Sequence, residues 1–280
     1  MKIGQYTIHS IETGSFWLDG GAMFGVIPWV FWSKSNPPDA RNRVELVARC
    51  LLLQGNDRTI LLDTGCGTKW TDKQRDIYGF DNSHSDLFSS LNKAGIERED
   101  VTDVILTHLH FDHAGGATVL QDENFTPSFP RAKYYIQRLH WDYAQHPTEK
   151  DRASFIQENY QPLFEKNMVE LVDGEVELFP GIEVVATQGH TKSLQLPKIT
   201  DGQTTLLYCS DLIQLVAHLA YSAVHGYDLY PLTTIEEKKQ IFKKAFEEQW
   251  ILFLEHDPRY TVIKLKKGEK GFDVDRAVVI

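Results

Sequence analysis

The sequence has little of what several common protein classes require. It contains 3 cysteines in 280 residues, none in a Cys-x-x-Cys pair, so we expect free thiols in a reducing compartment rather than a disulfide scaffold. No stretch approaches the ~20 consecutive apolar residues of a membrane span. The N-terminal residues also lack the pattern of a signal peptide. These absences predict a cytoplasmic protein without a membrane partner.

Positive charge is scarce as well. The 29 Lys and Arg residues face 39 Asp and Glu, which gives a formal net charge of −10 with His neutral. Binding to a phosphate backbone needs clustered Lys and Arg. The densest basic cluster, at Lys264, Lys266 and Lys267, is more typical of a solvated strand end. We therefore expect no nucleic-acid partner.

The chain shows no internal repeat and no flexible linker, and short β-type runs alternate with amphipathic helices throughout. This pattern favours one domain of α/β character over residues 1–280. Strands are predicted at 44–53, 59–62, 101–107, 132–137, 182–187, 205–209 and 250–254. Helices are predicted at 87–94, over 140–164, and from a capping box that Thr234 forms with Glu237.

The strongest chemical signal follows the strand 101–107, where the chain reads His108-Leu109-His110-Phe111-Asp112-His113. In an extended segment alternate side chains face the same way, so His108 and His110 can reach one metal ion. The following Gly115-Gly116 lets the backbone turn, so that Asp112 and His113 can point at a neighbouring position. Imidazole and carboxylate ligands suit zinc, iron, manganese or cobalt, and we expect two divalent ions, with zinc as the first choice.

Three later residues extend this set: His190 in Gly-His-Thr, Asp211 in Ser-Asp, and His256 in Glu-His-Asp. Each lies within a few residues of the end of a predicted strand, where a rigid support can direct ligands into one cleft. A carboxylate has two oxygens, so Asp211 could ligate both ions.

Together with Asp63-Thr64-Gly65 upstream, this set resembles the metallo-β-lactamase superfamily over nearly the whole chain. The resemblance implies an α+β fold, an αββα sandwich in which helices flank two mixed β-sheets, with a dinuclear metal site at the sheet edge. It implies that His108, His110 and His190 hold the first metal. Asp112, His113 and His256 would hold the second, Asp211 would bridge the two, and Asp63 would orient ligands without binding metal.

Within the superfamily the stretches 18–25, 107–115 and 227–231 resemble the N-acyl-homoserine lactonases and related lactonases, together with their organophosphate-hydrolase relatives. This branch implies quorum quenching, in which a hydroxide bridging two metals opens a lactone ring. Asp112 is expected to shuttle the proton, and Tyr227 to bind the carbonyl oxygen. The alternative is a phosphoester or organophosphate hydrolase with the same site. An iron oxidoreductase and a non-catalytic binding protein are further alternatives.

The stretch 23–32 is unusually apolar and contains Met23 and Phe24. We expect it to form a lip over the metals that contacts an apolar part of a small-molecule substrate. A homodimer interface and ordinary core packing are the alternatives. His218 and Tyr221, which follow Asp211, are further candidates for the substrate pocket.

Overall fold

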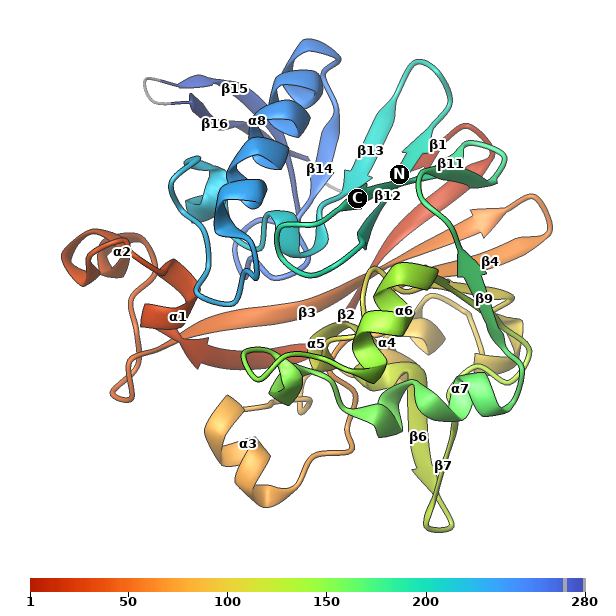
Figure 1. Ribbon diagram of the computed structural model, residues 1–280. Helices are drawn as coiled ribbons and strands as arrows, with labels where there is room; N and C mark the ends of the chain where they lie inside the picture. Colours follow the sequence, from red (N-terminus) through yellow and green to blue (C-terminus); the bar gives the residue numbers. More distant parts are fainter. Residues whose placement is uncertain (269–270, 279–280) are drawn as a thin grey trace.

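The computed structural model describes residues 1–268 and 271–278, and its strands form two seven-stranded sheets and a two-stranded hairpin (Figure 1). The first sheet contains, in spatial order, β1 (Lys2–Ile3), β2 (Tyr6–Asp19), β3 (Arg43–Gly55), β4 (Arg58–Leu62), β5 (Asp103–Ile105), β8 (Lys133–Gln137) and β9 (Val169–Val172). The second contains β10 (Val176–Phe179), β11 (Ile182–Thr187), β12 (Leu194–Thr200), β13 (Thr205–Tyr208), β14 (Ile251–Phe253), β15 (Val262–Gly268) and β16 (Gly271–Val278). The hairpin is β6 (Thr118–Gln121) and β7 (Asn124–Pro127).

Both sheets are mixed. In the first sheet β1 to β4 pair antiparallel, whereas β4, β5, β8 and β9 pair in parallel. In the second sheet only the β13–β14 pair is parallel among the described strands. Strands β3 and β4 join through Asn56 and Asp57, whose φ angles of 55° and 56° give the turn that hairpins favour. The strands predicted at 44–53 and 59–62 are therefore confirmed.

Helices cover the outer face of each sheet, so that the layers run αββα. The α-helices are α1 (Gly20–Phe24), α2 (Trp29–Ser35), α3 (Asp72–Tyr78), α4 (Leu87–Lys93), α5 (Phe111–Ala114), α6 (Arg138–Gln145), α7 (Gln161–Glu165) and α8 (Pro231–Glu247). Short 3₁₀ turns lie at Arg98–Asp100, Gly115–Ala117, Arg152–Ser154, Gln157–Asn159, Ser210–Leu212 and Val216–Leu219. Leu91 of α4 and Trp141 of α6 pack on the first sheet, while Phe242 of α8 packs on the second. The expected αββα architecture, with helices flanking two mixed sheets, is confirmed.

The core between the sheets draws side chains from both. Ile8 and Leu53 of the first sheet lie in one buried cluster with Val184, Leu206 and Phe253 of the second, and each is at most 1% exposed. Burial of this shared apolar surface holds the two sheets together and fixes the loops at their common edge.

Two helix predictions are wrong in detail. The segment 140–164 is not one helix, because α6 ends at Gln145 and only short helical turns follow until α7. Helix α8 begins at Pro231 rather than at Thr234, since proline is well placed in the first turn, where its missing N–H costs nothing. Glu237 accepts hydrogen bonds from the backbone N–H groups of Gln188 (2.6 Å) and Gly189 (3.1 Å) instead of closing a capping box.

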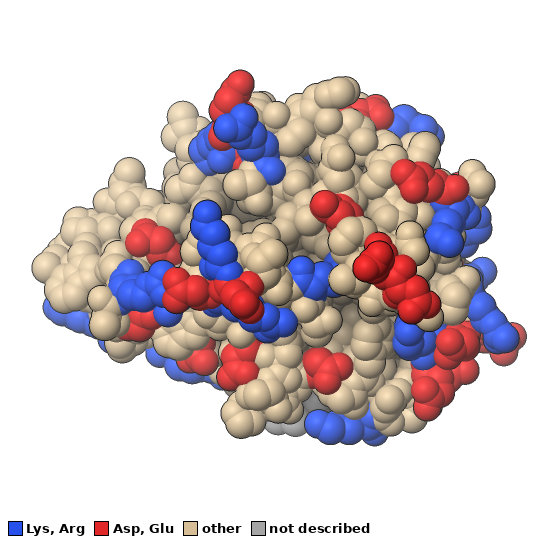
Figure 2. All heavy atoms as spheres, turned by 90° about the horizontal axis from the view of Figure 1, so that it is seen from below, with Lys and Arg blue, Asp and Glu red and all other residues tan. Residues whose placement is uncertain are grey.

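The surface agrees with the charge balance of the sequence. On the face in Figure 2 acidic and basic side chains alternate, and the described atoms there form no continuous basic stripe. Among the residues that the structure describes, no helix combines the length and apolarity needed to cross a membrane. Helices α1 and α2 project from the body of the molecule, on the left in Figure 1.

Candidate metal centre

The seven residues singled out as metal ligands converge in one buried cluster at the edge of the two sheets. The first group is His108, His110, His190 and Asp211, and the second is Asp112, His113, Asp211 and His256. Within each group the candidate ligand atoms all lie within 4.8 Å of one another. Asp211 belongs to both groups, as a bridging carboxylate would.

The spacing of these atoms fits metal ions. In the first group, His110 Nδ1 lies 3.0 Å from His108 Nε2 and 3.3 Å from His190 Nε2. Ligands about 2 Å from a tetrahedral ion are about 3.3 Å apart, which matches these separations. Asp211 Oδ2 lies 3.0 Å from His190 Nε2, and its Oδ1 lies 3.2 Å from His256 Nε2. The two oxygens thus face different groups.

Electrostatics favour the same interpretation. Burial lowers the pKa of His108 and His110 far below its usual value, and neighbouring imidazoles lower it further. Both rings are therefore neutral and can offer lone pairs. Burial alone would raise the pKa of Asp211, but the imidazoles of His113 and His190 outweigh it and hold that carboxyl ionised. A buried anion among converging nitrogens is the donor set of a cation site.

Local backbone geometry explains how one short segment serves both groups. Strand β5 ends at Ile105, and the chain continues to His108 and His110 before turning into α5, which carries Asp112 and His113. The turn after α5 lies against the loop that follows β4. A Cβ atom at Gly115 would collide with the carbonyl of Cys66. A larger residue at this position would therefore push the turn after α5 away from the loop that follows β4.

Carboxylates behind the cluster orient its imidazoles. Asp63 accepts hydrogen bonds from the backbone N–H and the hydroxyl of Thr107, both at 2.7 Å, and lies 3.0 Å from His113 Nδ1. This placement agrees with the orienting role expected for Asp63. Glu255 lies 3.2 Å from the same His113 nitrogen, and Asp228 lies 2.9 Å from His190 Nδ1.

Neither Glu255 nor Asp228 was identified from the sequence as a site residue. Both carboxylates are almost completely buried, at 0% and 2% exposure. The sequence could have indicated Glu255 only through its position next to the candidate ligand His256. Asp228 is 38 residues from its partner His190, so no local pattern reveals the contact.

The turn that presents His256 is held by strand β3. His256 Nδ1 lies 2.8 Å from the carbonyl oxygen of Val47, and the Val47 N–H donates to the His256 carbonyl at 3.1 Å. The guanidinium of Arg49 donates to the carbonyls of Leu254 and Asp257, one on each side of the histidine. Arg49 also pairs with Glu12 at 2.6 Å, and these contacts fix the position of His256.

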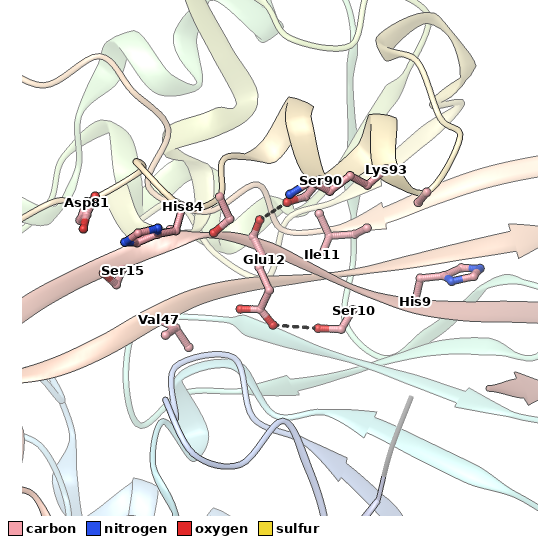
Figure 3. Close-up of a pocket in the computed structure, with 13 residues that line it drawn as sticks. His9, Ser10, Ile11, Glu12, Ser15, Val47, Asp81, His84, Ser90 and Lys93 are labelled. Atoms are coloured by element: carbon pink, nitrogen blue, oxygen red, sulfur yellow. Dashed lines mark hydrogen bonds between the residues drawn. The ribbon is translucent and has the colours of Figure 1, made fainter.

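Glu12 belongs to a separate surface groove of about 550 Å³, which is shown in Figure 3. Its lining includes His9, Asp81, His84 and Lys93 and contains none of the seven candidate ligands. The groove therefore lies apart from the candidate metal ligands. It is connected to the turn of His256 by the Glu12–Arg49 ion pair and by Val47, which also lines the groove.

A smaller cavity of about 150 Å³ opens directly onto the cluster. It is lined by Leu18, Tyr78, His110, Phe111, Asp112, Lys150, Ala153, Ser154, His190, Asp211, Gln214 and Tyr227. Of the residues predicted to contact substrate, Asp112 and Tyr227 are in this lining. Burial raises the pKa of the Tyr227 hydroxyl, so the phenol keeps its proton at neutral pH and can donate it in a hydrogen bond.

The four residues expected to form the substrate pocket are absent from this lining. Met23 and Phe24 are 0% and 2% exposed, and Phe24 stacks on Trp32 with ring centroids 4.9 Å apart, so they belong to the core. His218 is buried, accepts from the Leu215 N–H and lies 3.0 Å from the Met23 carbonyl oxygen. Tyr221 stacks on Phe242 of α8, away from the cluster.

The predicted lip is thus divided between core and surface. Val26, Trp29, Val30 and Phe31 are 55–85% exposed and form an apolar surface on the projection of α1 and α2. We call these four residues the apolar projection.

Comparisons with known proteins agree with the fold. A family model described as the metallo-beta-lactamase superfamily matches residues 43–241. An N-acyl homoserine lactonase from Bacillus cereus is 25% identical over 246 residues, which cover 82% of this chain and 87% of that protein.

Two solved structures share the architecture. A probable metal-dependent hydrolase from Staphylococcus aureus has a TM-score of 0.89 at 28% identity, with 100% of both chains covered. The dizinc quorum-quenching lactonase AidC has a TM-score of 0.80 at 22% identity, with 100% of this chain and 97% of its own covered, and this is a likeness of fold. From its sequence match, its αββα layers and its buried His/Asp cluster, the chain belongs to the metallo-β-lactamase superfamily.

Proposed function

We propose that the protein is a metal-dependent hydrolase that opens lactone rings, such as those of N-acyl homoserine lactones. The observation that carries the proposal is the cavity of about 150 Å³ next to the His/Asp cluster, which is small and combines apolar walls with a few polar groups. Lactonases among the relatives support it. Two divalent ions, for which we propose zinc, would polarise the ring carbonyl and make a hydroxide nucleophile available at neutral pH.

The chain's own residues would bind the substrate and move protons. Leu18 and Phe111 line the cavity with apolar surface, which excludes water from the reacting ring. Tyr227 also lines the cavity, and its hydroxyl would donate a hydrogen bond to the carbonyl oxygen, where negative charge develops during attack.

Asp112 would carry the proton to the leaving group. It lines the cavity, where a carboxylate can accept a proton and return it during ring opening. Asp112 would accept the proton of the hydroxide that has added to the carbonyl carbon. When the ring C–O bond breaks, the released alkoxide would take this proton from Asp112, and the product would leave as a hydroxy carboxylate.

The test is hydrolysis of a panel of C4 to C12 N-acyl homoserine lactones, with a paraoxon-type phosphotriester assayed in parallel. Chelator-sensitive turnover of the lactones well above that of the phosphotriester is expected. No lactone turnover by enzyme with bound metal would refute the assignment, and high phosphotriester turnover would favour an organophosphate hydrolase.

A matched pair of tyrosine variants tests the mechanism. We expect Tyr227→Phe to lower kcat by about 10-fold or more at unchanged metal content, because one hydrogen bond to developing charge is lost. Tyr221→Phe, which changes a tyrosine packed on Phe242, is the control and should retain full activity. Equal activity of the two variants would show that Tyr227 does not bind the carbonyl.

A further inference from the structure

One polar side chain in the cavity wall is neither a candidate metal ligand nor satisfied by the protein. Gln214 lies in the short link between the 3₁₀ turns Ser210–Leu212 and Val216–Leu219, three positions after Asp211. It is 3% exposed and lines the cavity. Its Oε1 atom has no hydrogen-bond partner in the part of the chain that the structure describes.

An unpaired buried amide oxygen is unfavourable. Leaving such a group without a partner costs about 1–3 kcal/mol. Because Gln214 lines the cavity beside the cluster, a substrate bound there can supply the missing partner. Two other polar side chains of the wall already have partners within the protein. Lys150 donates to the carbonyls of Gly226 at 2.7 Å and Tyr227 at 3.0 Å, and His190 is held by Asp228.

The backbone around Gln214 is fixed. Ile213 and Leu215 on either side are both 0% exposed and anchored in apolar clusters. Because Gln214 is itself 3% exposed, packing already restricts its rotamers, and little side-chain entropy remains to be lost when it binds a ligand. The amide is therefore a preorganised binding group rather than a mobile surface side chain.

The chemistry of a glutamine amide limits what can satisfy it. Its end carries one acceptor and one donor, and a half-turn of the last torsion exchanges their positions. A secondary amide in the substrate offers both complementary groups, a carbonyl oxygen and an N–H. A plain lactone or a phosphotriester offers acceptors alone, so it cannot supply the donor that Oε1 lacks.

We propose that Gln214 hydrogen-bonds a secondary amide of the substrate and thereby selects N-acylated lactones over plain lactones. This inference rests on the proposed lactone hydrolysis and narrows its substrate class. It makes Gln214 a specificity-determining residue that touches the substrate beside the reacting ring.

The experiment compares wild-type enzyme with Gln214→Met on two substrates of similar size, N-hexanoyl homoserine lactone and γ-decalactone. Methionine keeps the length of the side chain and removes its hydrogen-bonding groups. We expect kcat/KM for the amide substrate to fall by about 10-fold or more, while that for γ-decalactone changes by less than about 3-fold. Metal content should stay the same.

Thermal unfolding provides a second readout. Replacing an unpaired buried polar group by an apolar one should leave the melting temperature unchanged or higher. Gln214→Leu serves as a second variant if the methionine does not pack. An equal fall for both substrates, or no fall for either, would overturn the role of Gln214. Failure of metal-loaded wild-type enzyme to open either lactone would refute the proposed function itself, and this inference with it.

Discussion

Removal of the Asp228 carboxylate should weaken one metal site selectively. Asp228 Oδ1 lies 2.9 Å from His190 Nδ1, and both side chains are at most 3% exposed. Burial raises the pKa of Asp228, but the imidazoles of His225 and His190 outweigh it and keep the carboxyl ionised. The contact fixes the orientation of the imidazole and makes its Nε2 atom, which faces the cluster, a better ligand.

The magnitude follows from this geometry. Loss of such an outer partner typically lowers metal affinity by about 10- to 100-fold, which corresponds to about 1.4–2.7 kcal/mol. Because His190 belongs to the group with His108 and His110, Asp228→Asn should weaken that site. The other group should keep its affinity, since it shares Asp211 but not His190 with the first.

The assay is a zinc titration against a chromophoric chelator, which resolves two successive dissociation constants. Asp151→Asn is the matched control. Its carboxylate is also buried, at 5% exposure, but bonds to Tyr143 and Thr148 rather than to any candidate ligand. Unchanged zinc affinity in Asp228→Asn, or an equal loss at both sites, would refute the reasoning.

Three further outcomes are expected. Arg49→Met should lower zinc affinity at the site of His256, and the same titration measures this affinity. Glu12→Gln should lower it less, because the hydrogen bonds from Arg49 to the turn of His256 remain. A larger loss of affinity in Glu12→Gln than in Arg49→Met would contradict this. Burial lowers the pKa of Lys238 from 10.5 to about 8, so the unfolded chain binds more protons between these pH values and stability rises with pH there. For the wild type, the free energy of unfolding should rise by up to about 1.4 kcal/mol per pH unit in this range. Denaturant titrations at several pH values should show that Lys238→Met lacks this rise, and the same pH dependence in both proteins would contradict the prediction. We also propose that the apolar projection forms a homodimer interface, so Phe31→Ser should lower the mass measured by sedimentation. Leu139→Ser changes a 52% exposed leucine on α6 and should leave the mass unchanged. A monomeric wild-type protein would contradict the proposal.

The local parts of the candidate site could be predicted from the sequence. His108, His110, Asp112 and His113 lie within six residues, so backbone periodicity alone indicates that they act together. His190 could be placed because it follows a recognisable strand, β11, and this strand has the bounds expected from its β-branched residues.

The walls of the cavity could not be predicted, because they depend on contacts between distant segments. Lys150 and Tyr227 meet only after folding, through a bond that spans 77 positions. Apolar patterning also cannot distinguish a core residue from a lip, and so Met23 and Phe24 were misplaced. The same limit applies to Thr234, whose local capping pattern was overridden by Pro231.

The order of the two sheets along the chain has a consequence for how the protein matures. Strands β1 to β9 end at Val172, and β10 to β16 begin at Val176, so each sheet comes from one continuous half. Four candidate ligands come from the first half, whereas His190, Asp211 and His256 come from the second. During synthesis on the ribosome the first sheet can form before the second exists, yet neither metal group is complete until the halves dock. Metal uptake is therefore a late step, and the metal content of a nascent or divided chain would report whether its two halves have assembled.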